Sequence, residues 1–397
     1  MKSLLIKIGK ANRLWKRSGF WGGIKTLFNY FIIYCKTFFV SSGDVLFISS
    51  GVGDSAHYRA YNPAEELRLH GFKTAVTISD NPNLPKLADK FKVFIFHRTA
   101  CNKFVKKLIK NIKKQKKEII FDSDDLVYDP KYLVRMDYFQ KLSVAEKELY
   151  KKGIGAEIIN DPYVKNCTTT VNYLAEKLRQ KGKEVIIVPN KLSNQEVSLA
   201  EEILKKEKKK DGFLRLGYFS GTLSHNKDFA TITQPLIKML KRYPKVKLVL
   251  AGPLDINNQL NKYKSRIEIL PFVSRNKYYK NIRQVDINLA PLEIGNPFCE
   301  SKSAIKFIEA GILNIPTVAV RNQTFSETIK DGADGFLANN PEEWLEKINR
   351  LIENENLRHH MGRKAREKVL EKYTNQNSKN KKYYDYIRSK CNSKIAN

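Results

Sequence analysis

Residues 296–311 carry the densest group of side chains in this sequence that could hold a phosphorylated ligand. The pattern predicts a helix that begins at Lys302, so that the first helix amides, with Lys302 and Ser303, would form an anion site. Glu309 falls about two turns later, on roughly the face of Lys302 and Lys306. A carboxylate there can accept hydrogen bonds from both hydroxyls of a ribose. A charged surface helix is the alternative, but the apolar residues between these positions favour a largely buried helix.

A second loop with the character of a phosphate site follows the strand predicted at 213–219. Gly221 and Thr222 are small residues at the carboxyl end of that strand, where backbone amides can approach phosphate oxygens. Lys227 would add a positive charge against a diphosphate. The other interpretation is a tight turn beside a surface lysine, and we favour phosphate binding because the loop ends a strand.

A glycine turn also follows the first predicted strand, at 45–49. Gly51 and Gly53 begin a G-x-G-x-x-A sequence between a strand and a helix, which is the spacing of dinucleotide-binding turns. Those sites also use an acidic residue about 20 positions later, whereas Asp80 lies 29 positions after Gly51. A NAD-dependent oxidoreductase therefore stays open as an alternative function. More commonly, such glycines let the backbone turn tightly or let a diphosphate approach it.

Short apolar strands that alternate with amphipathic helices position these loops. The alternation predicts parallel sheets with right-handed crossovers, and 397 residues suit two domains better than one. We therefore expect an α/β protein with two doubly wound Rossmann-like domains that face each other across a cleft. Strands are predicted at 45–49, 74–78, 93–96, 118–121, 167–171 and 184–188, and then at 213–219, 246–251, 267–270, 285–289 and 316–320. The predicted parts are an amphipathic segment at 1–43, a first domain at 44–190, a helical solvated linker at 191–211, a second domain at 212–374, and a helix with a polar tail at 375–397.

The charge balance favours an acidic partner. Lysine and arginine total 72 against 41 acidic residues, a formal net charge of +31, which suits phospholipid headgroups, nucleic acid or a phosphorylated substrate. A lysine-rich surface without such a partner is the alternative. We find none of the recognised nucleic-acid-binding modules, so we expect no nucleic-acid partner.

Cysteine and histidine give no sign of a metal site. The five cysteines are scattered, odd in number and without a C-x-x-C pair, which argues against a disulfide framework and a structural zinc site. The six histidines show no metal-binding spacing. We expect a protein of the reducing cytoplasm with no bound metal and no cofactor.

Residues 1–43 combine positive charge with an apolar stripe. They hold eight lysines or arginines and no acid, and apolar residues from Ile24 to Phe39 follow helical spacing. Asn29 and Lys36 interrupt the stripe, so it does not predict a transmembrane span, and no good signal-peptide cleavage site follows it. An amphipathic helix lying on the anionic inner face of the cell membrane fits best. The alternative is a helix that packs on the protein's own body.

Several of these motifs resemble one enzyme family. Gly221 with Lys227, the Gly-Pro-Leu turn at 252–254, and the Lys302–Glu309 helix followed by Gly-Ile-Leu-Asn-Ile-Pro-Thr-Val look like the donor half of the group 1, or family 4, glycosyltransferases. The resemblance covers about 45–390 and is more specific in the second half. It implies the two-Rossmann fold called GT-B, a nucleotide-sugar donor on the second domain and an acceptor on the first. It also implies retention of anomeric configuration, no required metal ion, and a tail that crosses back to the first domain after Thr374.

The sequence departs from the family pattern at the paired glutamates. Seven residues separate them in the family, whereas eight separate Glu300 from Glu309, and Ser301 stands where the first is expected. The resemblance thus implies Glu309 as the ribose-binding acid and, from a poorer match, Glu300 as a ligand of donor-sugar hydroxyls. The family also often has a histidine after the strand equivalent to 118–121, for which His97 is a substitute that does not align.

An acidic cluster occupies the place of that histidine. Asp122, Asp124 and Asp125 follow the predicted strand, and a D-x-D run can hold Mg²⁺, although that motif serves the other glycosyltransferase architecture, which has one Rossmann-like domain. Asp122 or Asp124 could instead touch the acceptor hydroxyl or stabilise the sugar cation, or Asp122 could cap a helix. We take Asp122, Asp124 and His97 as candidate catalytic residues.

Together these observations predict transfer of a sugar from a nucleotide diphosphate to a hydroxyl of a lipid-linked or polysaccharide acceptor. Lys227, Lys302 and helix amides would stabilise the leaving phosphates. A nucleotide-sugar-binding protein with the same fold and little turnover is the alternative, which the altered glutamate spacing supports.

Overall fold

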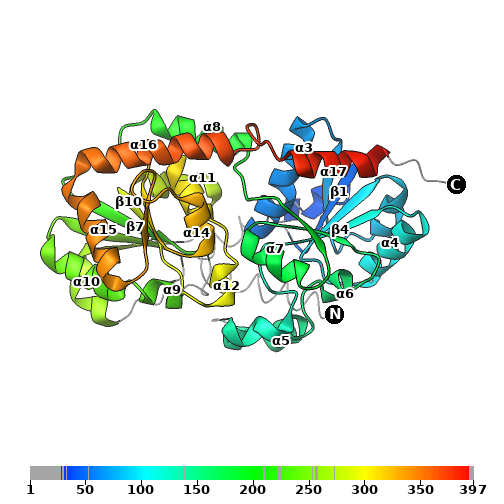
Figure 1. The fold of residues 1–397 in the computed structure, drawn as a ribbon, viewed down its shortest axis with the longest axis horizontal. Coiled ribbons are helices and arrows are strands. Elements are labelled where there is room, and N and C mark those ends of the chain that lie inside the picture. The colour runs from blue at the N-terminus through cyan, green and yellow to red at the C-terminus, as the bar shows by residue number, and fades with distance from the viewer. Residues whose placement is uncertain are drawn as a thin grey trace.

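The computed structural model describes residues 28, 31–32, 34–51, 53–136, 139–208, 211–221, 226–252, 254, 258–271 and 273–392. These residues form two α/β domains, each with one parallel six-stranded sheet (Figure 1). The N-terminal domain lies on the right of Figure 1 and the C-terminal domain on the left. The predicted fold class of two doubly wound domains is therefore confirmed.

The sheet of the N-terminal domain has the order β2-β1-β3-β4-β5-β6, and all neighbouring strands are parallel. The interior strands β1 and β3 are buried throughout, as expected for a parallel sheet covered on both faces. The strands are β1 (Val45–Ser49), β2 (Thr74–Ile78), β3 (Val93–His97), β4 (Glu118–Ser123), β5 (Asn166–Thr169) and β6 (Glu184–Ile187).

Alternate side chains of these strands enter two different cores. Val45 and Phe47 of β1 pack in a cluster with side chains of α3 and α17, whereas Leu46 and Ile48 pack with α4 and α7 on the other face. The helices are α2 (Asp54–Ala56), η1 (His57–Tyr61), α3 (Asn62–Leu69), η2 (Leu84–Asp89), α4 (Lys103–Lys114), η3 (Pro130–Arg135), η4 (Phe139–Lys141), α5 (Val144–Lys151), α6 (Ala156–Ile159) and α7 (Asn172–Arg179).

The sheet of the C-terminal domain has the order β12-β11-β10-β7-β8-β9 and is also parallel. The order reverses direction beside β7, which is where doubly wound sheets open a crevice for ligands. The strands are β7 (Leu214–Phe219), β8 (Val246–Ala251), β9 (Ile267–Leu270), β10 (Ile287–Ala290), β11 (Thr317–Val320) and β12 (Phe336–Ala338).

Helices α10 and α15 pack against each other beside this sheet, and α13 packs against α11 and α16. The helices are α8 (Asn194–Leu204), α9 (Asn226–Ala230), α10 (Thr233–Arg242), η6 (Asn258–Arg266), α11 (Arg275–Arg283), α12 (Pro297–Glu300), α13 (Ile305–Gly311), α14 (Gln323–Thr328), α15 (Pro341–Glu353), α16 (Glu355–Lys372) and α17 (Lys381–Asn392).

The chain passes between the domains twice, and the two passages lie side by side. The amide of Leu192 donates to the carbonyl of Tyr373 at 2.8 Å, and the amide of Asn375 donates to the carbonyl of Leu192 at 2.9 Å. After the first passage, Ser193 and Glu196 form a capping box at the start of α8. One side of α8 is buried against α11, so the connecting segment is packed and not solvated along its length. After the second passage, α17 returns to the N-terminal domain and contacts β3 and β6 (Figure 1).

Most predicted strands lie within two residues of the observed ones. The elements that were not predicted include β12, α6, α12 and α14, which are short and lack a clear apolar period. The helix predicted from Lys302 is wrong at its start, because α13 begins at Ile305. Residues 302–304 form a turn after α12, so the anion site predicted on helix amides at those positions is not built by a helix end.

The N-terminal segment lies mostly outside the described residues, which leaves the predicted amphipathic helix untested at 1–27, 29–30 and 33. Residues 28, 31–32 and 34–36 are helical. The carbonyl of Thr37 accepts hydrogen bonds from Thr77 and Asn81, which ties this segment to the edge of the first sheet. None of the helices in the described part of the chain has the length and hydrophobicity needed to cross a bilayer.

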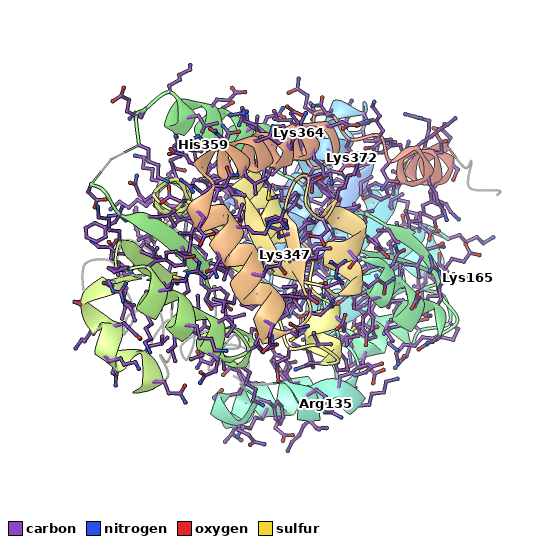
Figure 2. The ribbon with its side chains drawn as sticks, turned by 60° about the vertical axis from the view of Figure 1, so that its left-hand side comes forward. Arg135, Lys165, Lys347, His359, Lys364 and Lys372 are labelled. Carbon is purple, nitrogen blue, oxygen red and sulfur yellow. The ribbon has the colours of Figure 1, made fainter. Side chains whose placement is uncertain are left out.

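The positive charge is spread over both domains. Figure 2 labels basic residues on η3, before β5 and on α16, and Arg135, Lys165, Lys364 and Lys372 among them are exposed. The charge of the chain is therefore not confined to its first 43 residues.

Candidate active site

A cavity of about 370 Å³ lies between the domains, where the carboxyl ends of both sheets meet. Both domains contribute polar side chains to it, as expected for a ligand site at this place in a doubly wound fold. Its polar lining includes Asp54, Ser55, Tyr58, Arg98, Asp124, Asp125 and Asn190 from the N-terminal domain and Ser220, Arg275, Tyr278, Asn281, Lys302, Ser303, Lys306 and Glu309 from the C-terminal domain.

Two backbone loops of the C-terminal domain touch at the cavity wall. Gly252, after β8, has a φ of 93°, and a Cβ on it would lie 1.8 Å from the carbonyl oxygen of Ser220. No other residue fits this turn without displacing the loop after β7. The close contact holds Ser220 and Gly221 at the cavity, where their backbone can approach a ligand.

Two lysines and a serine from the turn before α13 and its first turn reach the same cavity. Lys302 and Ser303 line it, and the side-chain amide of Asn190 donates to Ser303 Oγ at 3.0 Å across the domain boundary. Lys306 donates to the carbonyl of Phe219, and its Nζ lies 4.9 Å from the ring centre of Tyr218. Burial lowers the pKa of Lys306 to about 8, although Glu309 and Asp228 act in the opposite direction.

Glu309 is buried and engaged with protein groups on both carboxylate oxygens. Tyr58 of the N-terminal domain donates to Oε1 at 2.5 Å, and Tyr278 donates to Oε2 at 2.7 Å. Burial raises the pKa of Glu309, and the charge of Arg275 only partly opposes this. A ribose that used this carboxylate would have to replace at least one tyrosine hydroxyl.

Arg275 joins the two domains at this point. Its Nη2 lies 2.9 Å from Asp54, and its Nη1 donates to Tyr58 at 2.8 Å and to Glu196 at 3.0 Å. Its guanidinium also lies over the Tyr58 ring, 4.9 Å from the ring centre. One arginine of the C-terminal domain thus neutralises acids from both sides of the cleft.

The N-terminal wall is organised around buried Asp122, which follows from its position near the end of β4. Arg59 donates to both carboxylate oxygens, His97 Nδ1 lies 2.7 Å from Oδ1, and Thr168 donates to Oδ2 at 2.7 Å. Burial alone would raise the pKa of Asp122, but the charge of Arg59 and the hydrogen bond with His97 lower it below its ordinary value. Asp122 is therefore ionised and fixed in place.

Ser55 and Asp124 continue this network to the cavity surface. Ser55 Oγ lies 2.7 Å from His97 Nε2 and 3.2 Å from Asp124 Oδ2. Arg98 pairs with Asp124 at 3.1 Å and with Asp125 at 2.9 Å. Burial raises the pKa of Asp124, but Arg98 and then His97 lower it well below its ordinary range.

The sequence of residues 200–368 matches the protein family described as Glycosyl transferases group 1. These residues form a group 1 glycosyltransferase domain. The match contains the loop after β7, the turn after β8 and the Lys302–Glu309 stretch that form the C-terminal wall of the cavity. A comparison with curated proteins gave no significant match for the chain.

Solved structures share the fold of the whole two-domain chain. A glycosyltransferase from Rickettsia africae ESF-5 superposes with a TM-score of 0.61 at 14% identity, over 89% of this chain and 100% of that one. Alr3699/HepE from Anabaena, in complex with UDP-glucose, gives 0.55 at 14% identity over 89% and 100%. Sucrose-phosphate synthase from Thermosynechococcus elongatus gives 0.57 at 12% identity over 87% and 98%. The glycosyltransferase domain is thus the second half of a GT-B fold.

The structure brings about half of the predicted site residues to the cavity. Asp124, Gly221, Lys302, Ser303 and Glu309 line it. Others lie away from its lining: His97 and Asp122 stand behind Ser55, Glu300 accepts a hydrogen bond from the amide of Gly295, and Gly51, Gly53 and Lys227 are outside it. Thr222 lies outside the described residues.

Ser55, Tyr58, Arg98, Arg275 and Lys306 are among the lining residues that the sequence did not predict as site residues. For Lys306 a signal existed, because it lies one helical turn after Lys302. For Ser55 the signal was its position two residues after Gly53, at the beginning of a helix. Arg275 stands at the start of α11 with no motif around it.

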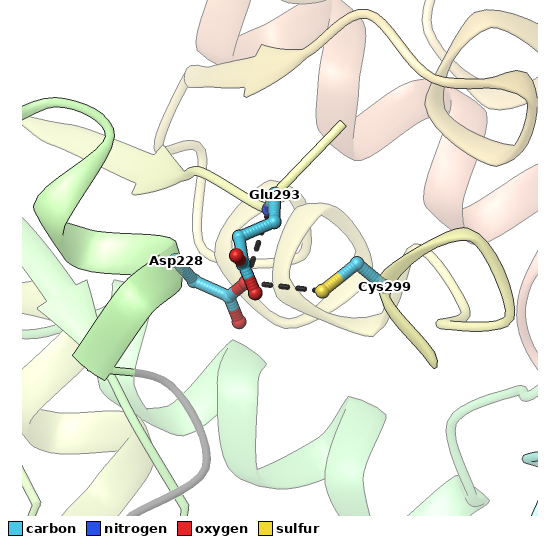
Figure 3. Close-up of side chains that lie close together, drawn as sticks. All are labelled: Asp228, Glu293 and Cys299. Atoms are coloured by element: carbon cyan, nitrogen blue, oxygen red, sulfur yellow. Dashed lines mark hydrogen bonds between the residues drawn. The ribbon is translucent and has the colours of Figure 1, made fainter. Parts of the chain in front are cut away.

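One group of potential metal ligands occurs among the described residues of the glycosyltransferase domain. Ligand atoms of Asp228, Glu293 and Cys299 lie within 4.8 Å of one another (Figure 3). Asp228 Oδ1 accepts hydrogen bonds from the amide of Glu293 at 3.1 Å and from the Cys299 thiol at 3.2 Å. Burial and the neighbouring Asp228 raise the pKa of this thiol, so it keeps its proton. Through these hydrogen bonds Asp228 of α9 holds α12 and the loop before it in place.

Proposed function

We propose that this protein transfers a sugar from a nucleoside diphosphate sugar to a hydroxyl of a lipid-linked or cell-surface polysaccharide acceptor. The observation that carries the proposal is the joint placement of Lys302, Lys306 and Glu309 on one side of a cavity whose other side bears a serine, an arginine and carboxylates. Cations suit a diphosphate, a buried carboxylate suits ribose hydroxyls, and the opposite wall offers groups for a sugar and its acceptor.

The charges of the cavity suit the charges that develop in such a transfer. As the bond to the anomeric carbon breaks, negative charge gathers on the leaving diphosphate, and Lys302 and Lys306 stabilise it. Positive charge gathers on the sugar ring, close to Asp124. We expect retention of configuration from the family resemblance, and a route in which the leaving phosphate itself takes the acceptor proton is available. Since lysines can neutralise the diphosphate, we expect transfer without a metal ion or other cofactor.

Ligands named for the related structures support this assignment of donor and acceptor. HepE from Anabaena is described in complex with UDP-glucose. TarM from S. aureus is described as a mutant in complex with Fondaparinux, alpha-GlcNAc-glycerol and UDP, with a TM-score of 0.50 at 14% identity over 78% of this chain and 58% of that one. A nucleotide sugar as donor and a hydroxyl on a polyol or saccharide as acceptor would fit the cavity described above.

A position on the cytoplasmic face of the membrane is part of the proposal. Phe28 and Phe31 are each 62% exposed and Phe39 is 87% exposed, so the described part of the chain leaves these apolar side chains largely uncovered. They belong to the segment with eight cations and no acid. Apolar side chains and cations together give reversible binding to an anionic leaflet, and a lipid-linked acceptor lies at that surface.

A ligand screen tests the proposed function. We expect nucleotide sugars and nucleoside diphosphates to raise the melting temperature of the full-length protein, whereas nicotinamide cofactors and oligonucleotides leave it unchanged. Stabilisation by NAD(H) alone would instead support an oxidoreductase. Release of nucleoside diphosphate from the best donor should survive chelation with EDTA, and a loss that Mg²⁺ restores would contradict metal independence.

A further inference from the structure

Four side chains form a continuous line of close contacts from the interior of the N-terminal domain to the cavity. Asp122 Oδ1 lies 2.7 Å from His97 Nδ1, His97 Nε2 lies 2.7 Å from Ser55 Oγ, and Ser55 Oγ lies 3.2 Å from Asp124 Oδ2. His97 is 1% exposed, whereas Ser55 and Asp124 line the cavity. Only the last two members of the line can touch a ligand.

The contacts of Asp122 determine where His97 carries its proton. Asp122 is held as a carboxylate by two hydrogen bonds from Arg59 and one from Thr168. A carboxylate only accepts, so His97 Nδ1 must be the protonated nitrogen. In neutral His97, Nε2 therefore carries a lone pair, and the hydroxyl of Ser55 donates to it.

Asp124 gives the hydroxyl of Ser55 a second acceptor. When His97 Nε2 gains a proton it becomes a donor toward Ser55 Oγ, and the Ser55 hydroxyl can turn to Asp124 Oδ2 without movement of heavy atoms. Asp124 also lies 3.9 Å from His97 Nε2, so its charge stabilises the imidazolium. Both protonation states of His97 thus have complete hydrogen bonding.

Charged groups from several elements face this line. Arg59 of η1 neutralises Asp122, Arg98 after β3 pairs with Asp124 and lies 3.3 Å from Ser55 Oγ, and Lys302 of the C-terminal domain acts on Asp124 across the cavity. Asp125 also pairs with Arg98 at 2.9 Å, so three cations and three carboxylates surround this line of side chains.

We propose that Ser55 is a catalytic residue of the transfer and passes the acceptor's proton to His97. The inference rests on the proposed function. The acceptor oxygen forms its bond to the anomeric carbon while the bond from that carbon to the phosphate oxygen breaks and its electron pair leaves with the diphosphate. The acceptor's proton moves to Ser55 Oγ, and the original Ser55 proton moves to His97 Nε2. Asp122 is a positioning residue that fixes the tautomer of His97. The relay determines where the proton goes and is compatible with either anomeric product.

Nitrogen-15 NMR of the histidine-labelled protein tests the geometry without any substrate. The signals of His97 are assigned with His97→Gln. We expect neutral His97 to carry its proton on Nδ1 in the wild type and in Asp124→Asn, because the carboxylate of Asp122 determines the tautomer. The variant Ser326→Ala, at an exposed position of α14, should leave the tautomer unchanged. A neutral tautomer protonated on Nε2 would overturn the proposal, because Ser55 would then be unable to donate.

Measurements of turnover test whether the acceptor's proton passes along this line of side chains. With UDP-glucose as donor and water as acceptor, we expect Ser55→Ala to lower kcat about 100-fold or more while UDP affinity stays within twofold. A relay that ends on an imidazole predicts a wild-type kcat that falls toward acidic pH, and Ser55→Ala should lose that dependence. Ser55→Thr keeps the hydroxyl and should recover most of the rate.

The outcomes separate this proposal from the proposed function. An unchanged kcat and pH profile in Ser55→Ala overturns the relay and leaves the phosphate as proton acceptor, with the transferase intact. A structural role alone would lower melting temperature and UDP affinity together and keep the acid dependence. If the wild type releases no UDP, that result counts against UDP-glucose as the donor. The proton-relay proposal is then tested by the tautomer of His97 in the NMR experiment.

Discussion

Lys306 should make the affinity for a nucleoside diphosphate depend on pH. Its ammonium group is withdrawn from water under the carbonyl of Phe219, and burial lowers its pKa to about 8 from an ordinary value of 10.5. A bound diphosphate favours the charged form. With this lowered pKa, Lys306 of the free protein is mostly charged below pH 8 and mostly neutral above it. Binding of a diphosphate above pH 8 must therefore add a proton to the lysine.

The size of the effect follows from the pKa. At pH 9 about one tenth of the free protein carries charged Lys306, so binding that requires the charge is weakened about tenfold, or about 1.4 kcal/mol, relative to pH 7. This drop in affinity holds if the bound diphosphate returns the pKa of Lys306 to near its ordinary value of 10.5. If binding raises the pKa of Lys306 by less, the loss of affinity between pH 7 and pH 9 is smaller.

Isothermal titration of the full-length protein with UDP at pH 7 and pH 9 measures this drop. Repeating the titration at pH 9 in two buffers of different ionisation enthalpy should reveal uptake of nearly one proton. Lys306→Met should bind more weakly at pH 7 and show neither the drop nor the uptake, which also controls for ionisation of UDP itself. Lys302→Met should bind more weakly and keep both. Equal affinity at the two pH values in the wild type would refute the placement of Lys306 against the phosphates.

Three further predictions concern separate parts of the molecule. Glu309→Gln should reduce the preference for ribonucleotides over deoxyribonucleotides, by up to about 1.5–3 kcal/mol for a charged hydrogen bond; competition titrations measure it, and an unchanged preference removes the ribose role. Asp122→Asn should destabilise the N-terminal domain by about 3–5 kcal/mol, because Arg59 is left buried without its counter-charge; urea unfolding measures it, and a loss below 1 kcal/mol would mean that Arg59 finds another partner. Deletion of residues 1–43 should abolish flotation with anionic liposomes at low salt and spare UDP binding, and a truncated protein that still floats would place the membrane contact elsewhere.

The sequence predicted the fold and the C-terminal wall of the cavity because both depend on local patterns. Apolar runs and glycine turns mark parallel strands and their loops, and the residues of the Lys302–Glu309 stretch that line the cavity lie close together in the sequence. The predicted start of this helix at Lys302 was wrong, because α13 begins at Ile305 and a separate short helix, α12, precedes it. Residues 296–304 offer several possible helix caps, and the choice among them depends on packing.

The N-terminal wall could be predicted only in fragments. Asp122, Asp124 and His97 were recognised as reactive residue types, but their roles depend on Ser55 and Arg59, which approach from another segment of the chain. Arg275 and Tyr58 meet across the domain boundary, 217 positions apart. No periodicity or spacing in a single sequence records such contacts, because they arise from how the two domains pack.

Release of UDP from UDP-glucose by the wild type and by Lys302→Met/Lys306→Met tests most directly whether the cavity is a donor site of a glycosyltransferase. The wild type should bind UDP and release it from UDP-glucose, and the double variant should remain folded and lose both properties. Equal release by the two proteins would contradict the assignment of the cavity, and a wild type that neither binds nor hydrolyses this or any other nucleotide sugar would contradict the proposed function itself.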